Sequence, residues 1–224
     1  ANLIFGMDFN DTGLTQQELV NKGPGFRQGN GLGIDELRIT DTAAGAVVLG
    51  VGLDLNGSPV PAIFNGIERV VIGTGLGAVA DRTGVVDIDV DAQLVAPGLN
   101  NVGLEILGNA GVNVIIGTIG NDVIDGGAGA DNLTGLLGND TYVVDDVLDT
   151  VSEVGGGGRD KVVVTGNFDY VLGTDFEDLT LQGTLAGQTG TGNALDNVIT
   201  GSLVSNTLLG DAGNDTINGG GGID

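Results

Sequence analysis

Acidic side chains recur at a fixed spacing in the middle of this chain. Three aspartates stand nine residues apart, at Asp122, Asp131 and Asp140. Two places after each aspartate stands a large side chain, namely Ile124, Leu133 and Tyr142. Carboxylate oxygens are the ligands that hard divalent cations such as Ca²⁺ prefer, provided that the fold brings several of them together. The chemistry therefore depends on the elements that carry these aspartates.

Those elements are nine-residue units rich in glycine. Four units run end to end from Gly108 to Val143: GNAGVNVII, GTIGNDVID, GGAGADNLT and GLLGNDTYV. Each has Gly at its first and fourth places, Asp or Asn at its sixth and a large residue at its eighth. A flexible glycine-rich linker is the alternative interpretation, but a linker has no reason to keep these places in phase. The period is typical of a stacked repeat structure.

The period also predicts the geometry. Six residues of turn and three of strand make half a coil, so two units close one coil. Glycine tolerates the positive φ values of such tight turns, and the eighth residue points inward between two parallel sheets. Coils then lie about 4.8 Å apart, which is the spacing of paired strands. Each aspartate is thereby expected to stack on the aspartate two units later.

Stacked carboxylates need a cation between them. Two carboxylates about 5 Å apart repel each other by roughly 3 kcal/mol at an effective dielectric constant of about 20. A Ca²⁺ ion midway between them, at its usual oxygen distance of about 2.4 Å, fits this gap, and carbonyl oxygens of the turns can complete its coordination. Several calcium ions are therefore the expected cofactors.

These motifs resemble the RTX, or haemolysin-type calcium-binding, repeat family of bacterial type I-secreted proteins. The resemblance implies an all-β fold, a parallel β-roll or β-solenoid of calcium-binding nonapeptide repeats. It also implies that the second, fourth and sixth places of one repeat share an ion with the first, third and sixth places two repeats later. The first predicted site comprises Thr118, Gly120, Asp122, Gly135, Leu137 and Asp140. The neighbouring predicted site comprises Asn109, Gly111, Asn113, Gly126, Ala128 and Asp131.

The first array is expected to continue beyond Val143. Residues 144–152 lack the glycines but keep the phase, and 155–163 again match the full pattern. The continuation pairs Gly127, Gly129 and Asp131 with Asp146 and Asp149. It likewise pairs Leu136, Gly138 and Asp140 with Gly155, Gly157 and Asp160. A solvated acidic loop around Asp145, Asp146 and Asp149 is the alternative for the first of these two pairs.

A second array begins at Gly192 and stops at Asp224, the sixth place of a repeat. Its predicted sites are Asn197 with Gly210, Ala212 and Asp215, and Asn206 with Gly219, Gly221 and Asp224. An amide offers one neutral oxygen, so these edges, and Asn113 opposite Asp131, should bind Ca²⁺ weakly or not at all. A ladder of Asn side chains can hydrogen-bond along the stack instead. The start without Met and the stop within a repeat suggest a piece of a longer protein.

The remaining segments read as β structure. Residues 34–39, 67–72 and 176–181 share one pattern: IDELRI, IERVVI and FEDLTL. We interpret residues 1–107 as a β-rich region of degenerate solenoid coils without calcium turns, with a separate β-sandwich as the alternative. The expected organisation is thus 1–107, a first array over 108–163, connecting β coils over 164–191, and a second, truncated array over 192–224.

Composition narrows the function. The chain has 24 Asp but only six Glu, no Cys and a net charge of −23, which disfavours binding to nucleic acid or insertion into anionic membranes. Without His or Cys, His-dependent catalytic triads and thiol nucleophiles are excluded from this segment. Asp87, Asp89 and Asp91 alternate with apolar residues. They form either the solvated face of a strand or a sugar-cleaving carboxylate pair, and we favour the first.

We therefore expect no enzyme here but a calcium-binding structural segment of a large secreted bacterial protein, located outside the cell or at its surface. It would fold on extracellular Ca²⁺ and act as a rigid scaffold or as a surface-layer or adhesive unit. The alternative is the secretion and folding module of an exported enzyme whose catalytic domain lies elsewhere. Self-association and a cell-surface glycan are the further partners considered, although two Tyr and no Trp leave few stacking platforms for sugars.

Overall fold

The fold is built from strands alone in the part of the chain that the structure describes. The computed structural model describes residues 102–153 and 157–224, and shorter segments at 7–9, 36–39, 45–48, 51–53, 59–61, 69–72, 82–83 and 88–92. Within these ranges there is no α-helix, and accordingly no helix long and apolar enough to cross a membrane. The predicted all-β class is confirmed.

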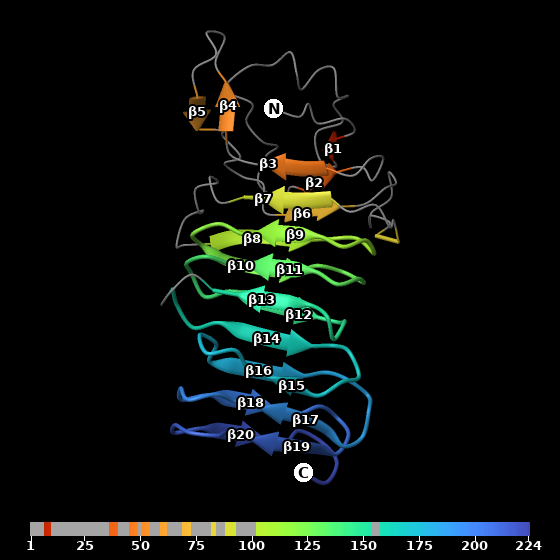
Figure 1. The fold of residues 1–224 in the computed structure, drawn as a ribbon, viewed down its shortest axis with the longest axis vertical. Coiled ribbons are helices and arrows are strands. Elements are labelled where there is room, and N and C mark those ends of the chain that lie inside the picture. Colours follow the sequence, from red (N-terminus) through yellow and green to blue (C-terminus); the bar gives the residue numbers. More distant parts are fainter. Residues whose placement is uncertain are drawn as a thin grey trace.

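One side of the molecule is a ten-stranded sheet that runs the length of the stack (Figure 1). In spatial order its strands are β1 (Met7–Phe9), β2 (Glu36–Ile39), β6 (Arg69–Ile72), β8 (Val102–Leu107), β10 (Asn121–Asp125), β12 (Thr141–Val144), β14 (Lys161–Val164), β16 (Asp178–Leu181), β18 (Val198–Thr200) and β20 (Thr216–Asn218). All neighbours pair in parallel except β1 and β2. Between two parallel neighbours of this sheet the chain passes through a strand of another sheet, and this topology is that of a β-solenoid.

The strands between these form the opposite side, which is divided into two sheets. The first contains β3 (Gly45–Val48), β7 (Ile88–Asp91), β9 (Val114–Ile116), β11 (Asn132–Thr134) and β13 (Thr150–Ser152). The second contains β15 (Tyr170–Val171), β17 (Gln188–Thr191) and β19 (Asn206–Leu209). A separate antiparallel pair is formed by β4 (Val51–Leu53) and β5 (Pro59–Pro61). The opposite side is therefore interrupted between β13 and β15, whereas the ten-stranded sheet is continuous.

The register confirms that two nonapeptides make one coil. Tyr142 on β12 stands beside Ile124 on β10, and Leu133 on β11 stands beside Ile115 on β9. These partners are eighth-place residues two repeats apart. The stack also extends past the four clear repeats, since β12 pairs with β14 and β11 pairs with β13 in the same parallel manner.

The core lies between the two sides and consists mainly of the eighth-place side chains. The fully buried ones, with 0% relative exposure, include Ile115, Ile124, Leu133, Tyr142, Val162 and Ile199, and Leu179 of the connecting coils is buried to the same extent. Side chains alternate between the two faces of a strand, so most residues on either side of a core residue are less buried, although β14 buries Val162, Val163 and Val164 in succession. Burial of one such side chain stabilises the fold by about 1.5–3 kcal/mol. One large residue per half-coil thus fills the narrow interior.

Strands from residues 1–107 join the same sheets. The three similar segments at 34–39, 67–72 and 176–181 form β2, β6 and β16 of the ten-stranded sheet. Likewise β3 and β7 pair in parallel, and β7 pairs with β9. These pairings favour degenerate coils over a separate sandwich. Asp87, together with the side chains of Asp89 and Asp91, lies outside what the structure describes.

The alternation along β10 gives a matched test of the core. Ile124 is 0% exposed and its neighbour Val123 is 40% exposed. Ile124→Ala should lower the free energy of unfolding by about 2–5 kcal/mol, because it removes buried methyl groups and leaves a cavity. Val123→Ala should change it by less than about 1 kcal/mol. Urea titrations in saturating Ca²⁺ measure both, and equal losses would contradict the assigned faces.

Candidate metal centre

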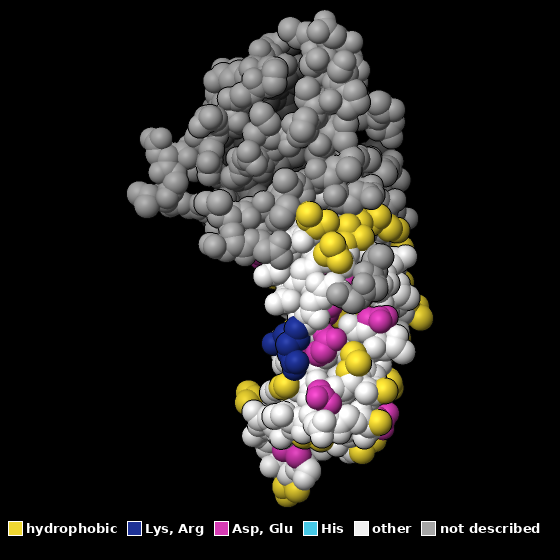
Figure 2. Space-filling view, turned by 90° about the vertical axis from the view of Figure 1, so that its left-hand side faces the viewer, with side chains coloured by type: hydrophobic (Ala, Val, Ile, Leu, Met, Phe, Trp, Pro, Cys, Tyr) yellow, Lys and Arg dark blue, Asp and Glu magenta, His cyan; other side chains and the backbone are white. Residues whose placement is uncertain are grey.

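Four sixth-place aspartates are almost completely buried. Their relative exposures are 1% for Asp122, 2% for Asp131, 1% for Asp140 and 1% for Asp160. An ionised carboxylate is costly to bury unless it is paired and hydrogen-bonded. The chain contains only seven Lys and Arg to pair with thirty acidic residues. On the face shown in Figure 2, the basic side chains of the described residues form one small group, which lies beside acidic side chains.

Each repeat folds its aspartate back over its own turn. In the repeat at 117–125, Asp122 Oδ2 accepts the backbone N–H of Thr118 at 2.6 Å. The Thr118 hydroxyl donates to Asp122 Oδ1 at 3.0 Å and accepts the N–H of Gly120 at 2.9 Å. A Cβ atom at Gly117 would lie 2.5 Å from Asp122 Oδ2 and 3.0 Å from the carbonyl oxygen of Gly135. The first place must therefore be glycine so that the carboxylate and a carbonyl of the next coil can approach.

The aspartates also connect consecutive coils in what we call the first column, which consists of Asp122, Asp140, Asp160 and Glu177. Asp140 Oδ1 accepts the N–H of Asp122 at 2.7 Å, and Asp160 Oδ1 accepts the N–H of Asp140 at 2.8 Å. Glu177 Oε2 then accepts the N–H of Asp160 at 2.7 Å. Each carboxylate therefore uses one oxygen to accept a backbone N–H of the preceding coil, and its other oxygen is left for a different partner.

A second column, consisting of Asn113, Asp131 and Asp149, runs along the opposite edge. Asp131 Oδ1 accepts the N–H of Asn113 at 2.7 Å, and Asp149 Oδ1 accepts the N–H of Asp131 at 2.9 Å. Asp149 Oδ2 also accepts the N–H groups of Asp145 and Asp146, both at 3.1 Å. The stretch at 144–149 is thus a closed turn of the roll, as its phase predicted, although it has none of the usual glycines.

Several carboxylate oxygens in these columns have no partner. Asp131 Oδ2 and Asp140 Oδ2 are buried and make no hydrogen bond. Burial is the main reason why the pKa of Asp122 is raised to about 6, that of Asp131 to about 7 and that of Asp140 to about 8. Neighbouring carboxylates raise the last two further. Buried, unpartnered anionic oxygens beside turn carbonyls fit a hard divalent cation such as Ca²⁺.

Comparison with known proteins agrees with this geometry. The model of the RTX calcium-binding nonapeptide repeat matches residues 107–142 and 191–224, in four copies. These two segments are therefore similar to RTX calcium-binding nonapeptide repeats. Such repeats bind Ca²⁺, so the number of repeats implies several ions, and they are typical of secreted bacterial proteins. Comparisons with curated proteins and with solved structures gave no match to this chain.

The structure brings the predicted ligand residues to the edges of the stack. The turns that lead into the ten-stranded sheet, together with the start of β10, contain Thr118, Gly120, Asp122, Gly135, Leu136, Leu137, Gly138, Asp140, Gly157, Asp160, Asn197, Gly210, Ala212 and Asp215. The turns at the opposite edge, together with the first residue of β19, contain Asn109, Gly111, Asn113, Gly126, Gly127, Ala128, Gly129, Asp131, Asp146, Asp149, Asn206, Gly219, Gly221 and Asp224. Gly155 lies outside the described residues. The part that each residue takes in coordinating an ion stays a prediction.

Fourth-place glycines show how closely the turns stack. Gly129 and Gly138 both have φ values of +126°, which favour glycine. A Cβ atom at Gly129 would lie 2.5 Å from the carbonyl oxygen of Gly111, one coil earlier. At Gly138 the atom would similarly collide with the carbonyl of Gly120. Predicted ligands from consecutive coils are therefore in contact.

The asparagines of the second array use their amides differently from the expected Asn ladder. Asn197 Nδ2 donates to the carbonyl oxygens of Phe176 and Glu177, at 3.1 and 3.2 Å. Asn206 Nδ2 donates to the carbonyl of Gln188 at 3.5 Å. The amides thus bond backbone carbonyls of the preceding coil rather than one another. At Asn197 and Asn206 the side-chain NH₂ group is thus the positively polarised partner of these carbonyl oxygens, in the role that a cation would have in the other coils.

Two functional contacts escaped the sequence reasoning. Arg82 donates from Nε to the carbonyl of Gly108 at 2.5 Å and forms a 2.9 Å ion pair with Asp125 Oδ2, so a guanidinium closes the start of the first array. The sequence feature that could have indicated this contact was a single basic residue, Arg82, shortly before an acidic array. The other contact is that of Glu153 with the first column. Its signal was the two-residue step between the repeats at 144–152 and 155–163.

The raised pKa values predict how the metal-free fold responds to pH. A carboxyl group whose pKa is near 3.8 when exposed and about 7 or 8 when folded binds its proton more tightly in the fold. Stability without metal should therefore fall as pH rises from about 4 to about 8. Metal-stripped protein should show more β-sheet circular dichroism at pH 5 than at pH 8.

Salt separates this effect from repulsion between surface charges. In about 1 M NaCl the Debye length is only about 3 Å, so exposed charges are screened while buried ones are not. The pH difference should persist at this salt concentration. A metal-free fold that becomes more stable between pH 5 and pH 8 would contradict the burial of ionised carboxylates.

Asp140 lies between two coil interfaces and should therefore serve two ions. Asp140→Asn should lower the number of bound Ca²⁺ ions by two and raise the Ca²⁺ midpoint for folding, because it removes a charge shared with Asp122 and Asp160. Asp196→Asn is the matched control, since Asp196 is an exposed fifth-place residue that accepts the N–H of Asn214. Calorimetric titration of both variants gives the counts. A loss of one ion or none in Asp140→Asn would show that the array does not continue through Asp160 as a metal-binding structure.

Proposed function

We propose that this segment is a calcium-triggered structural scaffold of a secreted protein. In this proposal the chain stays unfolded where Ca²⁺ is scarce and folds when it meets extracellular Ca²⁺. The observation that carries the proposal is the pair of columns of buried carboxylates whose second oxygens lack partners, at Asp131 and Asp140. Such columns disfavour the fold until cations enter them.

The energetics support a switch at millimolar calcium. Extracellular calcium modules bind with dissociation constants of about 0.1–1 mM. Each such site then contributes roughly 0.4–1.4 kcal/mol at about 1 mM free Ca²⁺ by mass action. The coils contact only their neighbours, so their stabilities add along the stack. Several sites in series therefore supply a sum comparable with the total stability of a small domain.

The shape supports a scaffold role rather than catalysis. The ten-stranded sheet forms a continuous rod of parallel coils (Figure 1), which suits a spacer, a surface layer or an adhesive array. The chain has no His or Cys to act as a catalytic base or thiol. Its conserved chemistry within each repeat is directed at the ion instead, through the carboxylates of the two columns.

A calcium titration tests this proposal. Metal-stripped protein near pH 7.5 should show little β-sheet circular dichroism and should gain it cooperatively as CaCl₂ rises to about 1–10 mM, the range of extracellular modules. Mg²⁺ at equal concentration should substitute poorly, because it prefers shorter bonds and dehydrates reluctantly. An unchanged β-sheet signal with and without Ca²⁺ would reject the switch.

A further inference from the structure

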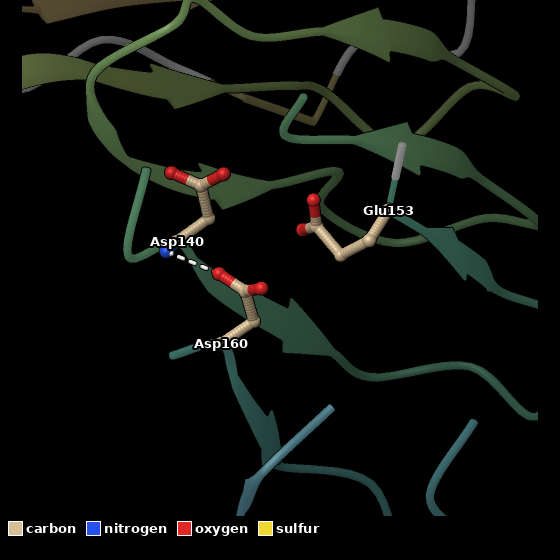
Figure 3. Close-up of side chains that lie close together, drawn as sticks. All are labelled: Asp140, Glu153 and Asp160. Carbon is tan, nitrogen blue, oxygen red and sulfur yellow. Dashed lines mark hydrogen bonds between the residues drawn. The ribbon is translucent and has the colours of Figure 1, made fainter. Parts of the chain in front are cut away.

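Three carboxylates lie close together in the first column, at the interface between the coil of Asp140 and the coil of Asp160 (Figure 3). We call such an interface between two coils a level. One oxygen from each of Asp140, Glu153 and Asp160 lies within 4.8 Å of the others. Asp140 and Asp160 are sixth-place residues of repeats, but Glu153 belongs to no repeat. This level therefore carries one more carboxylate than a pair of nonapeptides supplies.

The position of Glu153 explains how it enters the column. Thr134 pairs with Ser152 across β11 and β13, so Glu153 occupies the place that Gly135 takes one coil earlier. At Gly135 a Cβ atom would collide with Asp140 Oδ2 and Tyr142 Oη. After Glu153 the phase of the repeats shifts by two residues, so that Asp160 follows 20 rather than 18 residues after Asp140. Glu153 thus places a side chain where the coil before it has a glycine, at the point where the spacing of the aspartates increases by two residues.

Tyr142 holds the Glu153 carboxylate in place. The Tyr142 hydroxyl donates to Glu153 Oε1 and lies 3.2 Å from the carbonyl oxygen of Ser152. Tyr142 itself is 0% exposed and packs edge-on against Phe176, with ring centroids 5.6 Å apart. A rigid buried phenol thus fixes one oxygen of Glu153 and leaves the other for a different partner.

Two oxygens at this level lack partners. Asp140 is 1% exposed and its Oδ2 makes no hydrogen bond, and Glu153 Oε2 is likewise buried without a partner. Asp140 Oδ2 lies beside the Tyr142 hydroxyl, since both would touch a Cβ atom at Gly135. The ion pairs formed among the described residues, Arg69–Glu105, Arg82–Asp125 and Arg159–Asp178, involve none of the three carboxylates. The cluster therefore has three acidic groups and no basic partner within the described chain.

We propose that Glu153 is a third carboxylate ligand, and that it makes the Asp140–Asp160 level the tightest calcium site of the roll. Calcium affinity rises with the number of charged ligands, and an ion here would engage both unpartnered oxygens. The inference rests on calcium binding by the repeats, and it is independent of the scaffold role.

The location gives this site a structural task. Glu153 directly follows β13, the last strand of the five-stranded sheet, and β15 then begins the three-stranded sheet. An ion bound by Glu153, Asp140 and Asp160 connects the end of the interrupted side to the continuous ten-stranded sheet. The tightest site thus stabilises the level at which, among the described residues, the opposite side of the roll changes from the five-stranded to the three-stranded sheet.

Terbium luminescence tests the assignment on the whole 224-residue chain. Tb³⁺ replaces Ca²⁺ at oxygen sites and emits when a nearby tyrosine is excited, and this chain has two Tyr and no Trp. At substoichiometric Tb³⁺ the wild type should give strong emission through Tyr142. Glu153→Gln should lose most of this emission, and calorimetry should show the tightest Ca²⁺ site weakened by at least about tenfold. The Gln oxygen can still accept the Tyr142 hydroxyl, so the fold is retained.

Two further variants keep the test decisive. Tyr142→Phe should lose the emission because it removes the antenna, and it should weaken the tight site less than Glu153→Gln does, because it removes the hydrogen bond that positions Glu153 but no ligand. Asp175→Asn is the charge-matched control, since Asp175 is exposed yet its charge acts on Glu153, and it should leave emission and affinity within about twofold.

Unchanged emission and affinity in Glu153→Gln, with Ca²⁺ still bound, would overturn this proposal and leave the scaffold intact. A wild-type chain that binds no Ca²⁺ would reject both.

Discussion

Parallel stacking of equal coils forces like residues on top of one another, and the rest of this structure follows from that constraint. Eighth-place residues gain from it, because apolar side chains such as Ile124 and Tyr142 pack in a continuous core. The same stacking is unfavourable for the sixth-place aspartates, because Asp122, Asp140 and Asp160 bury like charges in one column. Cations between the coils offset the repulsion of the stacked carboxylates, so they are as necessary to the fold as the apolar core is.

Some of the levels that depart from the repeat provide another positive or neutral partner. Arg82 places a guanidinium against Asp125 at the start of the first array. Asn197 turns its amide toward the carbonyls of Phe176 and Glu177. Glu153 instead adds a further acidic group, at the level where the opposite side of the roll passes from the five-stranded to the three-stranded sheet. The affinity for calcium is therefore expected to vary along the stack, from the three-acid level to the asparagine levels.

Sequence reasoning succeeded where the determinants are periodic. The coil length, the inward eighth place, the pairing of Asp131 with Asp149 and that of Asp140 with Asp160 all follow from phase. It failed where a residue outside the repeat returns to it in space. Nothing local to Glu153 reveals that a two-residue step lets its side chain enter the column, and nothing near Arg82 reveals Asp125 as its partner. The Asn side chains were expected to hydrogen-bond along the stack, but their partners, the carbonyls of the preceding coil, cannot be identified from a repeat pattern.

Hydrogen exchange measured by mass spectrometry tests the central claim most directly, because it resolves the carboxylate levels from the asparagine levels within one molecule. The account predicts that backbone amides in 108–152 and 157–164 are poorly protected without metal at neutral pH and become strongly protected in millimolar Ca²⁺. Peptides from both columns should gain protection at the same calcium concentration, while those around Asn197 should depend less on the ion. Equal protection of 108–152 with and without Ca²⁺ would show that the stacked carboxylates need no cation, and would contradict the account.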